Sequence, residues 1–416
     1  MQKLSLDVCV IGFGKAGKTI AAKRAAAGDK VALVEADAEM YGGTCINIGC
    51  IPTKFLLTQA AAGQPYKDAQ QARNNFIAKL NSANQAMVEG KGVLLVTGIA
   101  SFSGPKTIFV GDQLELTADT IIINTGAVST VTAAGRIHDS TSIQQLTSAP
   151  ESLAIVGAGP IGLEFATMFK RFGTRVKVYN GAPEFLGQYD SDIAQAVREH
   201  LTQQGIEIVD QRVEDPEQLQ EELVLMAVGR RPAVAGLQLE AAGIAYTERG
   251  ITVTEHCETN IPGVYAVGDV TGAPQFTYAS YDDHRIVMAH RWGKQERSRK
   301  GRVLPSTVFI DPPLATVGST AKEAAATREI VVRQANIADL AIVPRPKILG
   351  QTAGVAKFVV DAASDEILGA TLFCVDAQEL INMVALAMRH GITAQQLGAG
   401  IYTHPATAEL FNAVLE

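Results

Sequence analysis

A glycine-rich pattern occurs twice in the sequence, once starting at Gly12 and again 145 residues later. Each copy has the spacing GxGxxG, follows an apolar run typical of a buried strand, and precedes a run typical of a helix. The glycines are Gly12, Gly14, Gly17, Gly157, Gly159 and Gly162. In a strand–turn–helix unit they allow a tight turn beside a pyrophosphate, which the helix N-terminus attracts. The repeat therefore predicts an α/β chain with two Rossmann-like, three-layer, dinucleotide-binding domains.

The residue that ends the second strand of each repeat differs between the copies. Glu35 follows Gly12 by 23 residues, and its carboxylate can accept a hydrogen bond from a ribose hydroxyl. The same offset from Gly157 leads to Asn180. An acid there would bind the 2′-hydroxyl of NADH and repel the 2′-phosphate of NADPH, and Asn180 does neither strongly. No arginine occurs at positions 181 to 189 to bind such a phosphate. The sequence therefore leaves NADH, NADPH or both open for the second site.

Two cysteines, Cys45 and Cys50, lie in the stretch GGTCINIGCIPTK, directly before a helical run. A disulfide between them would close a very short loop, so it should be strained and easily reduced. As a dithiol, Cys50 would lie near the helix N-terminus, where the dipole favours a thiolate. We therefore predict a redox-active pair, in which one sulfur holds negative charge and the other attacks the substrate. The alternative is a pair of buried structural cysteines.

The overall composition limits the compartment and the partners. Five cysteines form no disulfide-framework spacing, and apolar flanks predict that Cys9, Cys257 and Cys374 are buried core thiols. The formal net charge of −7 argues against nucleic acid as a main partner. No apolar run reaches the roughly 18 residues that span a bilayer. We predict a cytoplasmic protein without a metal site and without nucleic-acid or membrane partners.

The cysteine stretch and both glycine loops, together with IIINTG at 121 to 126 and TNIPGVYAVGD at 259 to 269, resemble the class I flavin disulfide reductases. This family includes glutathione reductase, dihydrolipoamide dehydrogenase and mercuric reductase. The resemblance implies FAD at the first nucleotide site and NAD(P)H at the second. The implied FAD-binding residues are Gly12, Gly14, Gly17, Glu35, Gly43, Thr44, Lys54, Gly126 and Asp269. The implied NAD(P)H-binding residues are Gly157, Gly159, Gly162, Glu164, Asn180 and Gly229.

Two polar pairs complete the implied catalytic set, which is Cys45, Cys50, His404, Glu409, Lys54 and Glu164. YTHPATAEL is similar to the family's HPxxxE dyad, in which a carboxylate orients an imidazole that reaches across a dimer to the partner's cysteines. Lys54 and Glu164 are candidates for an ion pair near the flavin, with a surface pair as the alternative. The resemblance thus implies a homodimer with an active site shared between subunits.

The order of the motifs predicts three domains. Residues 1–148 and 253–302 form a discontinuous FAD-binding domain, and residues 149–252 form the NAD(P)H-binding domain. Residues 303–416 form an α+β dimer-interface domain, as the resemblance implies. The basic segment 290–302, HRWGKQERSRKGR, is expected to be a solvated linker.

Four stretches look like one branch of the family, which includes the reactive-chlorine resistance protein RclA and bacterial hypothiocyanous acid reductases. They are GFGKAGKT, YGGTCINIGCIPTK, FTYASYDDHRIV and FCVDAQELIN. Members are flavoenzymes implicated in defence against oxidised halogen species, and some have been linked to copper(II) reduction. The resemblance implies a small-molecule oxidant as substrate. The alternatives are dihydrolipoamide dehydrogenase or another disulfide or mercuric reductase, and, in a different class, a flavin-binding redox sensor without turnover.

Overall fold

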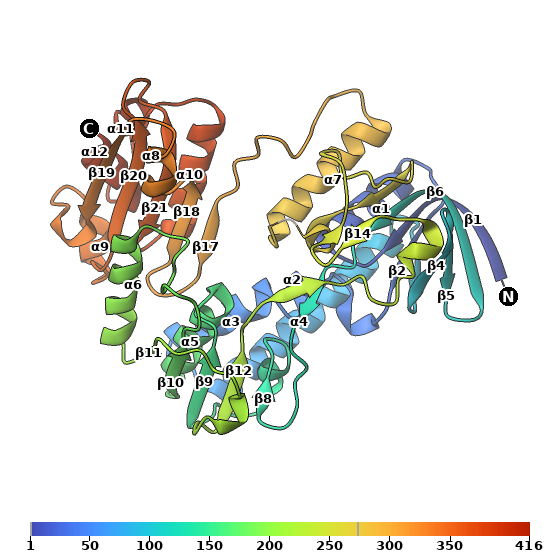
Figure 1. The fold of residues 1–416 in the computed structure, drawn as a ribbon, viewed down its shortest axis with the longest axis horizontal. Helices are drawn as coiled ribbons and strands as arrows, with labels where there is room; N and C mark the ends of the chain where they lie inside the picture. The colour runs from blue at the N-terminus through green and yellow to red at the C-terminus, as the bar shows by residue number, and fades with distance from the viewer. Residues whose placement is uncertain (1, 273) are drawn as a thin grey trace.

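The chain folds around three large β-sheets, and the computed structural model describes residues 2–272 and 274–416. The first sheet lies at one end of the molecule with the N-terminus, and the C-terminal sheet lies at the other end (Figure 1). The second sheet lies between them at the lower edge of that view. This arrangement confirms the predicted fold class of two Rossmann-like units and a C-terminal α+β unit.

The first sheet has the strand order β3-β2-β1-β6-β5-β4, with β16 beside β6. Its parallel strands are β1 (Gln2–Ile11), β2 (Val31–Glu35), β3 (Leu94–Thr97), β6 (Leu114–Ile123) and β16 (Val264–Ala266). An antiparallel extension adds β4 (Ala100–Gly104) and β5 (Thr107–Val110). The helices around it are α1 (Lys15–Ala26), α2 (Thr44–Asn47), α3 (Cys50–Ala61), α4 (Tyr66–Glu89) and α7 (Thr277–Trp292). The chain therefore returns to this sheet after building the second one.

The second sheet is entirely parallel, with the order β11-β10-β9-β12-β8. Its strands are β8 (Ile137–His138), β9 (Ser152–Val156), β10 (Arg175–Tyr179), β11 (Glu207–Val209) and β12 (Leu223–Met226), and its helices are α5 (Pro160–Arg171) and α6 (Ser191–Gln203). A ribbon of β7 (Ala127–Ser129) and β13 (Arg230–Pro232) lies apart from it. Strand β8 belongs to this sheet although it precedes residue 149, where we place the domain boundary. That boundary stays a prediction.

The two glycine loops repeat each other in atomic detail. Gly12 and Gly157 have φ angles of 96° and 113°, in the region that favours glycine. A Cβ on Gly12 would lie 2.4 Å from the carbonyl oxygen of Asn124, and one on Gly157 would lie 2.5 Å from that of Ala227. Asn124 directly follows β6, the neighbour of β1, and Ala227 directly follows β12, the neighbour of β9, so each loop is pressed against its sheet in the same way.

The C-terminal unit contains an antiparallel sheet in the order β17-β18-β21-β20-β19. The strands are β17 (Ser306–Val308), β18 (Leu314–Gly318), β19 (Ile330–Asn336), β20 (Val355–Asp361) and β21 (Ile367–Phe373). Its helices are α8 (Ala321–Ala325), α9 (Pro344–Ile348), α10 (Ala377–Arg389), α11 (Ala394–Gly398) and α12 (Leu410–Leu415). Helix α10 is amphipathic, and its buried residues contact β18 and β21.

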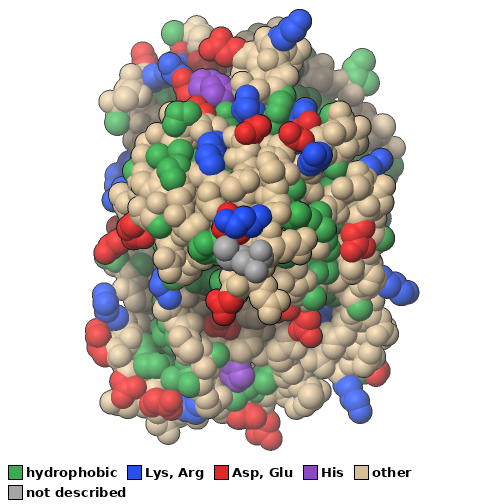
Figure 2. All heavy atoms as spheres, turned by 90° about the vertical axis from the view of Figure 1, so that its right-hand side faces the viewer, with side chains coloured by type: hydrophobic (Ala, Val, Ile, Leu, Met, Phe, Trp, Pro, Cys, Tyr) green, Lys and Arg blue, Asp and Glu red, His purple; other side chains and the backbone are tan. Residues whose placement is uncertain are grey.

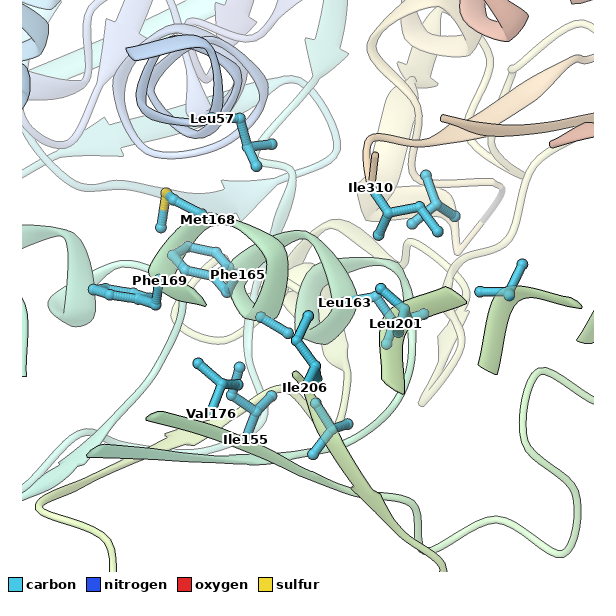
Figure 3. Packing of buried hydrophobic residues seen from close by; sticks show 14 of the residues in the cluster. Leu57, Ile155, Leu163, Phe165, Met168, Phe169, Val176, Leu201, Ile206 and Ile310 are labelled. Carbon is cyan, nitrogen blue, oxygen red and sulfur yellow. The ribbon is translucent and has the colours of Figure 1, made fainter. Parts of the chain in front are cut away.

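One apolar core connects all three units. Leu163 and Phe169 of α5 are fully buried and belong to the same cluster as Leu57 of α3 and Ile310 after β17 (Figure 3). Each buried side chain of this size stabilises the fold by roughly 1.5–3 kcal/mol. Helix α5 therefore packs against the cysteine-bearing helix and the C-terminal unit as well as against its own sheet.

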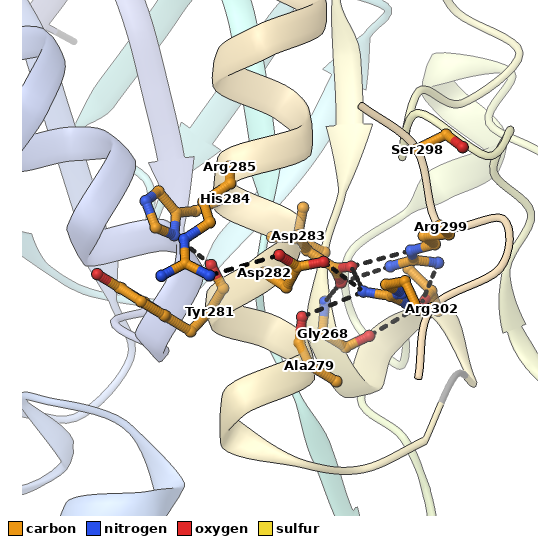
Figure 4. A network of polar contacts seen from close by, with 12 residues as sticks. Gly268, Ala279, Tyr281, Asp282, Asp283, His284, Arg285, Ser298, Arg299 and Arg302 are labelled. Carbon is orange, nitrogen blue, oxygen red and sulfur yellow. Dashed lines mark hydrogen bonds and ion pairs between the residues drawn. The ribbon is translucent and has the colours of Figure 1, made fainter. Parts of the chain in front are cut away.

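The basic segment 290–302 begins in the last turn of α7 and continues as a largely exposed linker, as expected, but three of its arginines form ion pairs within the chain. Arg297 pairs with Asp282 of α7. Arg299 Nε and Arg302 Nη1 both donate to Asp283 Oδ1, over 3.0 and 2.9 Å (Figure 4). Asp283 is only 1% exposed. A buried carboxylate needs such partners, and the arginines thereby fasten the linker to α7.

The surface carries charges of both signs. On the face that Figure 2 shows, basic and acidic side chains are interspersed, and neither sign forms a continuous region. Among the described residues, no helix combines the length and apolar character needed to cross a bilayer.

Candidate active site

A cavity of about 960 Å³ follows the carboxyl ends of the strands in the first sheet. This is where open parallel sheets bind their ligands, and the volume lies at the upper end of ordinary ligand pockets. The predicted residues that line it are Gly12, Gly14, Glu35, Gly43, Thr44, Cys45, Cys50, Lys54, Gly126, Glu164 and Asp269. The structure therefore brings the cysteine pair and most implied FAD-binding residues into one cavity.

The remaining predicted site residues do not line this cavity. They are Gly17, Gly157, Gly159, Gly162, Asn180, Gly229, His404 and Glu409. Pro160 and Ile161, at the start of α5, do line it, so the second glycine loop lies next to the cavity.

Two carboxylates that line the cavity, Glu35 and Asp269, suit an adenine dinucleotide with a ribityl chain. Glu35 accepts hydrogen bonds from Phe13 N and Ala36 N, both at 2.8 Å, and it keeps lone pairs for ribose hydroxyls. Burial raises the pKa of Glu35, and these N–H groups oppose the rise. Burial also raises the pKa of Asp269, while the charge of Arg230 lowers it. Both carboxylates can accept from sugar or ribityl hydroxyls, so the cavity fits FAD.

The two cysteines lie in consecutive helices: Cys45 is in the short helix α2, and Cys50 is the first residue of α3. The Cys50 sulfur is 3.4 Å from Thr277 Oγ1, in the first turn of α7. The pKa of Cys50 is lowered to about 6, chiefly because Cys45 donates a hydrogen bond to it, and also by Thr277 and Lys54, while burial opposes this. The pKa of Cys45 is raised by that hydrogen bond and by burial. This hydrogen bond therefore favours the thiolate on Cys50 and the proton on Cys45.

Lys54 and Glu164 form the expected ion pair, with Lys54 Nζ 2.6 Å from Glu164 Oε2. The amide of Phe309 donates to the other carboxylate oxygen at 3.0 Å, and Lys54 Nζ lies 4.8 Å from the centre of the Phe309 ring. The Glu164 side chain is 8% exposed, so the alternative of an ordinary surface pair does not describe it. The pair connects α3, α5 and β17 beside the cysteines.

His404 and Glu409 also meet, with 2.8 Å between His404 Nδ1 and Glu409 Oε1. The amide of Ala406 donates to the other carboxylate oxygen at 2.8 Å. That bond and the one to His404 hold the pKa of Glu409 below its usual value. The His404 side chain is 69% exposed, so the carboxylate orients an imidazole that faces solvent in the isolated chain.

Asn180 lies at the position that the repeat predicts, but its amide turns toward the neighbouring strand. Its Nδ2 donates to Asp210 Oδ1 at 2.9 Å, after β11, and the Asn180 side chain is buried. Asp210 in turn accepts from Arg198 at 2.7 Å. Binding of a nucleotide by Asn180 therefore stays a prediction.

Three site residues escaped the sequence analysis. Gln144 Nε2 donates to the carbonyl of Ile48, between the two cysteines, at 2.9 Å. Asn124 Oδ1 accepts from Gly17 N at 2.9 Å, and its Nδ2 donates to the strand that leads to Asp269. Thr277 contacts Cys50 as described. The sequence contained a signal for Thr277, because the stretch FTYASYDDHRIV follows Asp269 closely. It contained no signal for Gln144.

Comparison with known proteins defines the class. The pyridine nucleotide-disulphide oxidoreductase family matches residues 6–283, and the dimerisation domain of that family matches residues 304–414. The chain therefore belongs to the pyridine nucleotide-disulphide oxidoreductase family.

Within this family the chain is similar to RclA of Escherichia coli strain K12, a probable pyridine nucleotide-disulfide oxidoreductase, with 39% identity over 97% of each chain. It is 31% identical to mercuric reductase of Staphylococcus aureus, covering 94% of this chain and 78% of that protein. The solved structure of the HOCl-induced flavoprotein disulfide reductase RclA of E. coli matches with a TM-score of 0.94 and 37% identity, covering 98% of this chain and 99% of that one.

These findings confirm the sequence-based predictions at the level of the class. The chain is an oxidoreductase of a family that uses FAD and NAD(P)H, and its resemblance to the RclA-like branch is confirmed. The dimerisation domain indicates a homodimer.

Proposed function

We propose that this chain passes electrons from NAD(P)H through FAD and the Cys45–Cys50 disulfide to a small oxidant, with hypothiocyanous acid as the preferred substrate. The observation that carries the proposal is the cysteine pair at the cavity, with Cys50 as a thiolate and Cys45 as its hydrogen-bond donor. The likeness to RclA, described as HOCl-induced, supports an oxidant of reactive-chlorine origin. Copper(II) is the second candidate, because a copper(II) complex of RclA has been solved.

The reaction needs both sulfurs. The Cys45 sulfur loses its proton and attacks the sulfur of hypothiocyanous acid, and the oxygen leaves as water. The Cys50 thiolate then attacks the Cys45 sulfur, so the disulfide forms and thiocyanate leaves. Bound NAD(P)H and FAD supply the two electrons that reopen the disulfide. We propose that the Lys54–Glu164 ion pair balances charge beside the flavin.

We propose that the active site is completed across the homodimer, with the partner subunit's His404 taking the Cys45 proton. The exposure of the oriented imidazole supports this proposal. Mixing inactive Cys45→Ser chains with inactive His404→Ala chains should restore about a quarter of wild-type activity, since half of the random dimers are hybrids with one intact site. A hybrid population without activity would contradict the shared site.

A comparison of substrates tests the function. We expect the purified enzyme to show a kcat/KM for hypothiocyanous acid at least about a hundredfold above those for lipoamide and oxidised glutathione. Copper(II) should be tested as a substrate in the same series of assays. Faster turnover of lipoamide would favour the dihydrolipoamide dehydrogenase alternative, and NAD(P)H oxidation with none of the oxidants would favour the redox sensor.

The proposed location is the bacterial cytosol. The buried thiols of Cys9, Cys257 and Cys374 suit a reducing compartment. The balanced surface charge in Figure 2 gives no support to a nucleic-acid partner.

A further inference from the structure

A side chain from a distant segment fastens the turn that joins the two cysteine-bearing helices. Gln144, in the 3₁₀-helix η2 (Ser142–Gln145), is only 2% exposed. Its Nε2 donates to the carbonyl of Ile48 at 2.9 Å and to the carbonyl of Ser140 at 2.6 Å. Ile48 directly follows α2, at a helix end where backbone carbonyls need partners from outside the helix. Gln144 therefore holds a carbonyl that lies between the two cysteines.

Arg73 of α4 fixes the orientation of this amide. Arg73 is 4% exposed, and it donates from Nη1 to Gln144 Oε1 at 3.3 Å and from Nη2 to the Gln144 carbonyl at 2.9 Å. Its Nη2 also donates to Asn74 Oδ1 at 2.6 Å. The acceptors found for this guanidinium among the described residues are thus all neutral. Because Oε1 of Gln144 accepts from the arginine, the amide NH₂ group faces the Ile48 carbonyl.

The other contacts of the turn come from the cysteine stretch itself. Thr53 Oγ1 donates to the carbonyl of Gly49 at 2.8 Å, and Gly49 N donates to the carbonyl of Thr44 at 2.7 Å. Gln144, in contrast, lies 96 positions from Ile48, in the segment between β8 and β9 of the second sheet. The anchor therefore connects the cysteine turn to the unit that carries the second glycine loop.

We propose that Gln144 is a positioning residue that keeps the turn in the form in which the two sulfurs can bond, and that it thereby stabilises the Cys45–Cys50 disulfide relative to the dithiol. This inference rests on the proposed redox cycle of the pair. In the disulfide, the sulfur–sulfur bond itself restrains the turn, whereas in the dithiol only noncovalent contacts do so. Loss of the anchor therefore frees the dithiol more than the disulfide, and closing the ring then costs more conformational entropy.

The test is an anaerobic redox titration of the FAD-bound enzyme in dithiothreitol buffers at pH 7, with the cysteines trapped by alkylation and counted by mass spectrometry. Forming the Cys45–Cys50 bond releases two electrons, which oxidised dithiothreitol accepts as its own sulfur–sulfur bond opens, and the buffer exchanges the protons. In Gln144→Glu, the ratio of reduced to oxidised pair at a fixed buffer ratio should rise by about fivefold, which is about 20 mV for a two-electron couple.

Glutamate at position 144 separates the anchor from the packing around it. It keeps the length of the side chain and gives Arg73 a carboxylate partner, but an ionised carboxylate cannot donate to the Ile48 carbonyl. Gln145→Glu is the matched control, because it adds the same charge at the next residue, which is exposed, and it should leave the ratio unchanged. An equal rise in the control would overturn the inference.

A second variant covers the case in which Gln144→Glu fails to fold. Gln144→Asn adds no charge and keeps the amide, but its side chain is one methylene shorter and reaches the Ile48 carbonyl less well, so the ratio should rise in the same direction. An unchanged or lower ratio in the variants that fold would overturn the inference, and so would loss of bound FAD with an unchanged ratio. If the wild-type pair forms no disulfide at any buffer ratio, the proposed function itself fails, and the inference fails with it.

Discussion

Replacing Cys50 by serine should lower turnover by at least about 10³-fold and remove the long-wavelength charge-transfer absorbance of the two-electron-reduced enzyme. Cys50 is the sulfur with the lowered pKa, and it must both rest as a thiolate and resolve the Cys45 adduct. Stopped-flow oxidation of NAD(P)H and anaerobic reductive titration measure the two effects.

The matched variants are Cys45→Ser and Cys45→Ala. Both should lose turnover but keep the charge-transfer band, since Cys50 remains. The band should be present above the pKa of Cys50, about 6 in the native pair, and should disappear as the pH falls through it. In Cys45→Ala the midpoint should move to higher pH than in Cys45→Ser, because alanine donates no hydrogen bond to the thiolate. Full turnover in either the Cys50 or the Cys45 variants would disprove the scheme.

Replacing Asp283 by alanine should destabilise the protein by about 3–5 kcal/mol, because it leaves two arginines without their buried partner. Asp283 accepts from Arg299 and Arg302, and its Oδ2 also accepts from Gly268 N at 2.8 Å, next to the FAD-binding candidate Asp269. Bound FAD should therefore dissociate more easily as well. Guanidinium unfolding and flavin release by ultrafiltration measure the two losses.

The control for Asp283→Ala is Glu366→Ala, whose partner Arg328 is 46% exposed. Such surface pairs stabilise by about 1 kcal/mol or less. In Asp283→Asn, the amide oxygen can still accept from Gly268 N, so FAD retention should exceed that of the alanine variant. A change below about 1 kcal/mol in Asp283→Ala would show that the arginines find other partners or water.

The sequence predicted the parts of the fold that depend on local backbone requirements. Gly12 and Gly157 have positive φ angles, and each lies against a carbonyl at the end of a neighbouring strand in the sheet. The requirement for glycine at these positions is visible in the GxGxxG spacing alone. The pairing of Lys54 with Glu164 was inferred from resemblance, and the structure brings the two together. The catalytic roles of these and the other site residues stay predictions.

The sequence did not reveal contacts between residues that are distant along the chain. Thr277 meets Cys50 across 227 positions, and Gln144 reaches Ile48 across 96. The sequence of segment 290–302 is the same whether its arginines are solvated or paired with Asp283, so composition cannot distinguish the two cases. Only the way the linker packs against α7 in the folded chain determines whether these arginines are paired.

The shared core around α5 has a consequence for cooperativity. Leu57, Phe169 and Ile310 come from three different units of the chain but exclude water together. If the segment with the second sheet were excised, α5 would expose apolar side chains that now pack on α3 and the C-terminal unit. The three units should thus melt as one body, and the spacing between the second glycine loop and the sulfurs is built into the hydrophobic interior itself.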